Sequence, residues 1–226
     1  AGGDTTSYPG PPIFTITALG DNGAKKVGRS GAKKGDLILV SGEIGDSFIG
    51  LQLLQKNNIK SSFDEDKALI NKFLIPNPRI DIGKMIVNYA TSIIDISDGL
   101  LADLDHICKN SNVGADIYIK DIPFSKGAQN YINSNIFNHI ALITGGDDYE
   151  LLYTIDPKDI NKIDDSSSII GKITDGDGLS LYSTDNKLIE ASEKFMGYKH
   201  FWIIYFFNRV LHYTLTSGML ATIFIN

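Results

Sequence analysis

The sequence IDISDGLLADLD occupies residues 94–105 and carries the clearest structural pattern in the chain. The apolar run at 92–96 has the composition of a β-strand, and the Ser-Asp-Gly that follows is typical of a turn. Residues 100–109 then predict a helix, because apolar side chains recur on one side of it, at Leu101, Leu104, Ile107 and Cys108. A strand, a turn and a helix in immediate succession indicate a domain built from both kinds of element.

Strands and helices alternate along the rest of the chain as well. Periodicity and turn residues predict helices at 45–56, 64–74 and 80–89. Further strands are expected at 13–19, 36–41, 115–119, 139–143, 149–155, 168–173 and 179–182. No repeat of fixed period appears. This order predicts an α/β or α+β domain with a mixed sheet.

The composition is that of a soluble globular chain, with 226 residues of which 42% are hydrophobic and 21% are charged. A disordered or collagen-like chain is thereby excluded. Because 21 Lys+Arg stand against 27 Asp+Glu, the formal net charge is -6, and no nucleic-acid partner is expected. Cys108 is the only cysteine and permits no internal disulfide. We therefore expect a cytoplasmic protein with Cys108 in its core.

The two ends of the chain differ from its middle. The sequence opens at Ala1 on a glycine-rich turn without a Met, so we expect that a preceding element is missing and that no secretory leader is present. Residues 202–226 are far more apolar than the rest. A membrane anchor, an amphipathic or partner-buried tail and a non-native extension are the alternatives for this segment. The anchor is disfavoured, because Asn208, Arg209 and His212 fall near the middle.

Carboxylates and glycines recur together beside apolar runs, at 2–6, 94–105, 144–151 and 175–178. Most Asp-Gly pairs only form turns, which is the interpretation for the last of these. The second is more specific, because Asp95, Ser97 and Asp98 offer three oxygen ligands directly before a helix N-terminus. Such a set suits a hard cation such as Mg²⁺ beside a phosphate. An EF-hand is excluded, because Gly99 stands at the fifth position of that loop.

Arg29 is a further candidate, in an Arg-Ser-Gly turn ahead of two lysines. Its guanidinium group either clamps a phosphate or is an ordinary solvated cation. The sequence contains no P-loop, no G-x-G-x-x-G after a strand, no G-x-S-x-G elbow and no metal-ligand spacing among its histidines. Hydrolase and zinc-enzyme interpretations therefore fall away, and a nucleotide would have to be bound by another scheme.

Taken in order, these strings resemble the thiamine-monophosphate kinase family. The landmarks are GGDTT at 2–6, GRSGAKKGD at 28–36, NPRIDIG at 77–83, IDISDGLLADLDHI at 94–107, TGGDDYELLYTI at 144–155 and GYKHF at 197–201. The resemblance implies an enzyme that transfers a phosphoryl group from ATP to thiamine monophosphate, with several Mg²⁺ ions. It also implies an AIR synthetase C-terminal-like domain at 29–201, a remnant of the N-terminal ATP-binding domain at 1–28, and an apolar tail of unknown origin at 202–226.

By this resemblance, the ATP contacts are Gly3, Asp4, Arg29 and Ser97. The metal ligands are Asp4, Asp95 and Asp98, and the contacts to thiamine monophosphate are Asp147 and Tyr198. Many relatives carry Glu where this chain has Asp147, and the full-length family enzyme is expected to be a homodimer. Two alternatives stay open, since most of the N-terminal domain is absent. One is a non-catalytic or vestigial ligand-binding module, and the other is a different AIR synthetase-like ATP-dependent enzyme.

Overall fold

A mixed sheet forms the centre of the computed structural model, which describes residues 25–55 and 64–189. Within these residues the sheet has seven strands in the order β2-β4-β1-β5-β3-β6-β7. All neighbouring strands are antiparallel except β3 and β6, which are parallel. The strands are β1 (Leu37–Val40), β2 (Ala90–Asp95), β3 (Gly114–Tyr118), β4 (Leu151–Ile155), β5 (Ser168–Thr174), β6 (Gly178–Tyr182) and β7 (Leu188–Ile189).

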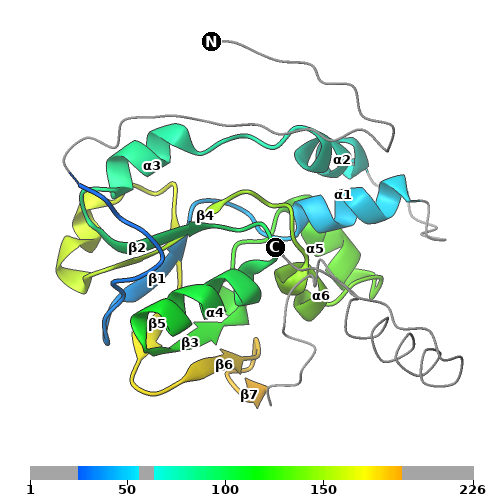
Figure 1. Cartoon of the computed structure of the whole chain (residues 1–226). Coiled ribbons are helices and arrows are strands. Elements are labelled where there is room, and N and C mark those ends of the chain that lie inside the picture. The colour runs from blue at the N-terminus through cyan, green and yellow to red at the C-terminus, as the bar shows by residue number, and fades with distance from the viewer. Residues whose placement is uncertain (1–24, 56–63, 190–226) are drawn as a thin grey trace, which may run out of the picture.

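Helices cover the sheet on both faces and extend beyond one end of it (Figure 1). They are α1 (Asp46–Leu54), α2 (Asp66–Leu74), α3 (Ile80–Ile86), α4 (Leu100–Ser111), α5 (Lys126–Asn133) and α6 (His139–Thr144). None of the helices in the described part of the chain is long and apolar enough to cross a membrane. The predicted α/β class with a mixed sheet is confirmed.

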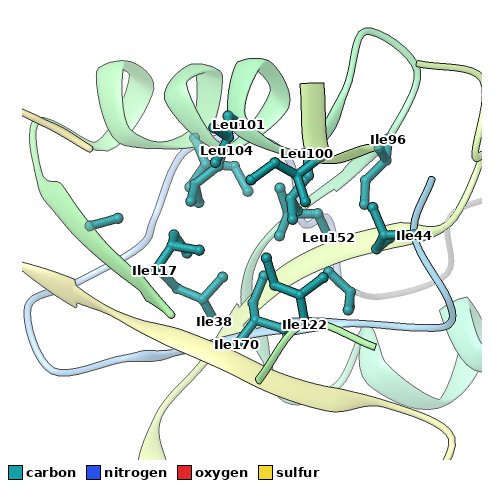
Figure 2. Close-up of a cluster of buried hydrophobic side chains, with 14 of the residues drawn as sticks. Ile38, Ile44, Ile96, Leu100, Leu101, Leu104, Ile117, Ile122, Leu152 and Ile170 are labelled. Atoms are coloured by element: carbon teal, nitrogen blue, oxygen red, sulfur yellow. The ribbon is translucent and has the colours of Figure 1, made fainter. Parts of the chain in front are cut away.

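The main core lies between α4 and one face of the sheet. Figure 2 shows Leu100, Leu101 and Leu104 of α4 above Ile38 of β1 and Ile117 of β3. Because side chains alternate along a strand, the neighbour of Ile38 points the other way, and Leu39 packs on the opposite face with α3. Cys108 is buried in the main core, as expected.

A third apolar cluster joins α1, α2, α5 and α6. Here α1 and α2 approach so closely that a Cβ at Gly50 would lie 2.2 Å from the backbone oxygen of Leu69. Only glycine fits that contact, so this residue sets the distance between the two helices.

Two expectations about secondary structure need correction. Residues 139–143 were expected to be a strand and instead form α6, and the helix α5 was not expected. In both helices the residue before the first turn accepts a hydrogen bond from a backbone amide, Asn138 from Ala141 and Ser125 from Ala128. The expected strand at 13–19 lies outside the described residues.

Candidate phosphate and metal site

Two loops meet where β2 ends and β4 begins. The amide of Asp147 donates to the Ser97 carbonyl at 3.0 Å, and the amide of Tyr149 donates to the Ile96 carbonyl at 2.8 Å. In return, the Ile96 amide donates to the Glu150 carbonyl at 2.8 Å. The sheet pairing thus continues past the strands and brings the Ser-Asp-Gly turn beside the Asp-Asp-Tyr-Glu segment, although the two lie some fifty residues apart in sequence.

Glycines make this approach possible. Gly99 has a φ of 114°, and a Cβ there would lie 2.7 Å from the Thr144 carbonyl oxygen. A Cβ at Gly146 would lie 2.3 Å from the Ser97 carbonyl oxygen. Any larger residue at either position would push the two loops apart.

The backbone amides in front of α4 are already bonded within the protein. One carboxylate oxygen of Asp103 accepts hydrogen bonds from the amides of Ser97 and Asp98, each at 3.0 Å. Asp103 is buried, and this burial raises the pKa of its carboxyl group. The carboxylate from the first turn of α4 thus bonds the two amides that precede the N-cap residue of this helix, Gly99.

Carboxylates of the turn and of α4 gather at one point. Single ligand atoms of Asp98, Asp103 and His106 lie within 4.8 Å of one another, while Asp95 is exposed at the end of β2. His106 was not among the expected site residues. The signal for it is its spacing from Asp103, because residues three apart share one face of a helix. Accessible carboxylate oxygens on Asp95 and Asp98 suit Mg²⁺, whereas an imidazole suits it less well.

The segment 147–150 alternates between outward and inward side chains. Asp147 is half-buried and Tyr149 is exposed, whereas Asp148 and Glu150 are buried. Asp148 accepts hydrogen bonds from the amide of Gly45 at 2.8 Å and from that of Ser47 at 3.4 Å, and so caps α1. Burial raises the pKa of Asp148 to about 8.

Glu150 is fully buried and tightly paired. Arg79 donates to both of its oxygens at 2.6 Å, Lys72 donates at 2.5 Å and the Ser41 hydroxyl donates at 2.7 Å. Burial raises the pKa of Glu150, but the hydrogen bonds from Arg79, Lys72 and Ser41 outweigh it and lower the pKa below its usual value. Glu150 therefore fixes the second loop to β1, to α2 and to the segment that leads into α3.

The residues expected at the site are placed as follows. Ser97, Asp98 and Asp147 belong to the two bonded loops, and Asp95 is at the adjoining strand end. Arg29 is exposed beside the outer edge of β2, where the Ile93 amide donates to the Gly28 carbonyl at 2.8 Å. Three further expected residues lie outside the described part of the chain, namely Gly3, Asp4 and Tyr198.

The chain belongs to a known class of protein domain, because residues 33–184 match the family "AIR synthase related protein, C-terminal domain". Within this class, the particular proteins that it resembles are thiamine-monophosphate kinases. The kinase of Buchnera aphidicola subsp. Schizaphis graminum is 40% identical over 209 residues, which are 88% of this chain and 63% of that protein. The kinase of Caulobacter vibrioides is 34% identical over 192 residues, 80% of this chain and 53% of that protein.

A solved structure described as AaThiL complexed with AMPPCP and TMP has a TM-score of 0.66 and 37% identity, covering 77% of this chain and 54% of that one. The expected resemblance to thiamine-monophosphate kinases is confirmed by these matches. The chain spans between about half and two thirds of the length of these relatives, at 63%, 53% and 54%.

Proposed function

We propose that the full-length protein transfers the γ-phosphoryl group of ATP to the phosphate of thiamine monophosphate, giving thiamine diphosphate and ADP. One observation carries this proposal. The two most acidic strings of the family pattern, far apart in sequence, are hydrogen-bonded side by side, so that Asp95, Asp98 and Asp147 gather at one end of the sheet. The likeness to thiamine-monophosphate kinases supports the choice of reaction.

Asp95 and Asp98 are the described residues that would hold Mg²⁺, together with Asp4 outside the described part. When bound, Mg²⁺ neutralises charge on the phosphate oxygens. We assign ATP contacts to Arg29 and Ser97 among the described residues, with Gly3 and Asp4 completing the set. Thiamine monophosphate would contact Asp147 and, beyond the described residues, Tyr198.

The reaction does not require a general base. The acceptor is an anionic phosphate oxygen, so it attacks without first losing a proton. The bond from the γ-phosphorus to the bridging oxygen of ADP breaks as the bond to the acceptor oxygen forms. Rate enhancement then rests on holding both phosphates in line and on lowering their mutual repulsion. The buried anchors Asp148 and Glu150 support this by fixing the loop that carries Asp147.

The compartment and the oligomeric state are proposals as well. We infer a cytoplasmic enzyme that works as a homodimer. The single cysteine, which is buried in the core, supports a reducing compartment. The expectation that nucleic acid is not a partner rests on the net charge of -6.

The test is ATP- and Mg²⁺-dependent formation of thiamine diphosphate by the full-length protein, followed by chromatography. Asp98→Asn removes one charged ligand atom and should lower kcat/KM by about 100-fold, equivalent to about 2.7 kcal/mol. The matched control is Asp105→Asn in α4, the helix that follows Asp98, where the carboxylate pairs with Lys109 at 2.5 Å, and its activity should be unchanged. Binding of thiamine monophosphate without turnover would instead support the ligand-binding module. Equal activity of the two variants would remove Asp98 from the site.

A further inference from the structure

Tyr149 is the one residue of the 147–150 segment whose exposure the proposed chemistry leaves unexplained. Its side chain is 40% exposed, whereas Tyr131 and Tyr153 are fully buried. Its φ is 51°, in the left-handed region that a bulky residue rarely adopts. Such a conformation costs free energy and persists only where neighbouring contacts impose it.

The neighbouring contacts are the two buried anchors. Asp148 is bonded to the N-terminus of α1, and Glu150 is bonded to Arg79 and Lys72. With inward side chains held on both sides, the backbone at Tyr149 has no freedom to relax, and its ring is directed outward. The structure therefore maintains an unfavourable backbone conformation that displays an aromatic ring at the rim of the site.

The surroundings of the ring are strongly acidic. The Tyr149 hydroxyl donates to a carboxylate oxygen of Asp147 at 3.2 Å. Partial burial raises the pKa of this hydroxyl, and the charges of Asp147, Asp95 and Asp98 raise it further. An exposed aromatic face beside a carboxylate attracts a cation.

We propose that Tyr149 is a substrate-positioning residue that receives the cationic ring of the substrate, which in thiamine monophosphate is the thiazolium. The inference rests on the proposed function. It adds to the proposed substrate contacts a residue that distinguishes a cationic ring from a neutral one. The hydrogen bond from the Tyr149 hydroxyl places the phenol beside Asp147, the residue assigned to the same substrate, and recognition of the cation is assigned to the ring and not to this hydrogen bond.

The test separates the ring from the hydroxyl and from the backbone. Tyr149→Phe keeps the ring and removes the hydrogen bond to Asp147. Tyr149→Asn removes the ring but is compatible with the left-handed backbone. Three asparagines of this protein already adopt that conformation, with φ of 54° at Asn112, 55° at Asn135 and 59° at Asn186. Loss of function in the Asn variant would therefore not come from backbone strain.

The measurement is calorimetry on the full-length protein with two probes, thiamine monophosphate and a phosphate ester whose thiazole ring is neutral. Wild type and Tyr149→Phe should prefer the probe with the cationic ring. Tyr149→Asn should lose about tenfold of that preference, with binding of Mg²⁺ and ATP unchanged. A purely structural role would weaken both probes equally. An unchanged preference in Tyr149→Asn, or an equal loss in Tyr149→Phe, would overturn the inference.

The same experiment keeps this inference apart from the proposed function. If wild type binds thiamine monophosphate and forms thiamine diphosphate while Tyr149→Asn keeps its preference, only the role of Tyr149 is overturned. If wild type does neither, the proposed function itself is overturned, and the role of Tyr149 with it.

Discussion

Three buried acidic side chains hold the candidate site together, two through backbone amides and one through cationic side chains. Asp103 bonds the amides that precede α4, Asp148 bonds the amides that begin α1, and Glu150 bonds two cations. A buried polar group is costly unless it is hydrogen-bonded, so these contacts leave the loops little freedom. These buried neighbours position Asp98, the proposed Mg²⁺ ligand, and Asp147, the proposed contact to thiamine monophosphate.

The ion pair of Glu150 gives a prediction about the stability of the fold. Arg79→Met removes both guanidinium hydrogen bonds and leaves a fully buried carboxylate with Lys72 and Ser41 alone. Urea unfolding should show a loss of about 2–3 kcal/mol. Lys84→Met is the control, because Lys84 makes only an exposed 3.6 Å pair with Asp81, and it should unfold like wild type. Equal midpoints for the two variants would contradict this role of Arg79.

Asp148 gives a prediction about pH. Its folded pKa is raised from 3.8 to about 8, so between these values the folded chain holds a proton that the unfolded chain has released. The contribution of this group to stability is therefore present at low pH and is lost as pH rises towards about 8. Asp148→Asn should gain stability relative to wild type between about pH 5 and about pH 8. Urea titrations at both pH values check this, with the exposed Asp177→Asn as control. A constant difference from wild type would refute it.

At the scale of elements, the distance between α1 and α2 depends on Gly50. A methyl group there would meet the Leu69 carbonyl oxygen at 2.2 Å, so Gly50→Ala should destabilise the protein by about 1–3 kcal/mol. Gly83→Ala in α3 is the matched control, because its nearest neighbour would be Leu151 at an ordinary 3.7 Å. That change should stabilise by about 0.5–1 kcal/mol, since alanine favours a helix. Thermal unfolding distinguishes the two, and a stabilised Gly50→Ala would show that the helices separate freely.

Elements with strong periodicity could be predicted from the sequence, and short apolar ones could not. The helix α4 follows from Leu101, Leu104 and Ile107, whose spacing repeats over about two turns. The run HIALIT of α6 has only six residues, which is too short for its period to separate a helix from a strand. Its Asn138 cap was the available signal, as Ser125 was for α5.

The candidate site shows the same division. Asp95, Ser97 and Asp98 could be predicted because the turn and the helix that display them are local in sequence. The pairing of Glu150 with Arg79 could not, because it joins positions 71 residues apart. The bonds from Ser97 and Asp98 to Asp103 are local, yet a carboxylate in a first turn gives no sign of whether it bonds amides or a metal.

In the molecule as a whole, the outer edge of β2 brings two of the expected site residues into the same region. In the described residues β2 is the outer strand of the sheet, and its outer side meets the backbone of Gly28 and Gly31. Arg29 lies between these two glycines, and Asp95 ends the same strand. The segment that carries an expected phosphate contact thus runs along the strand that carries an expected metal ligand. This arrangement agrees with the proposed assignment of ATP contacts to Arg29 and Ser97.

The most direct measurement is phosphorus NMR of the full-length protein with ATP, Mg²⁺ and thiamine monophosphate. Transfer to the substrate phosphate predicts that the thiamine monophosphate resonance disappears while two coupled resonances of thiamine diphosphate grow in step with ADP. Release of inorganic phosphate with the thiamine monophosphate resonance unchanged would contradict the account, because the site would then activate ATP without presenting it to this acceptor.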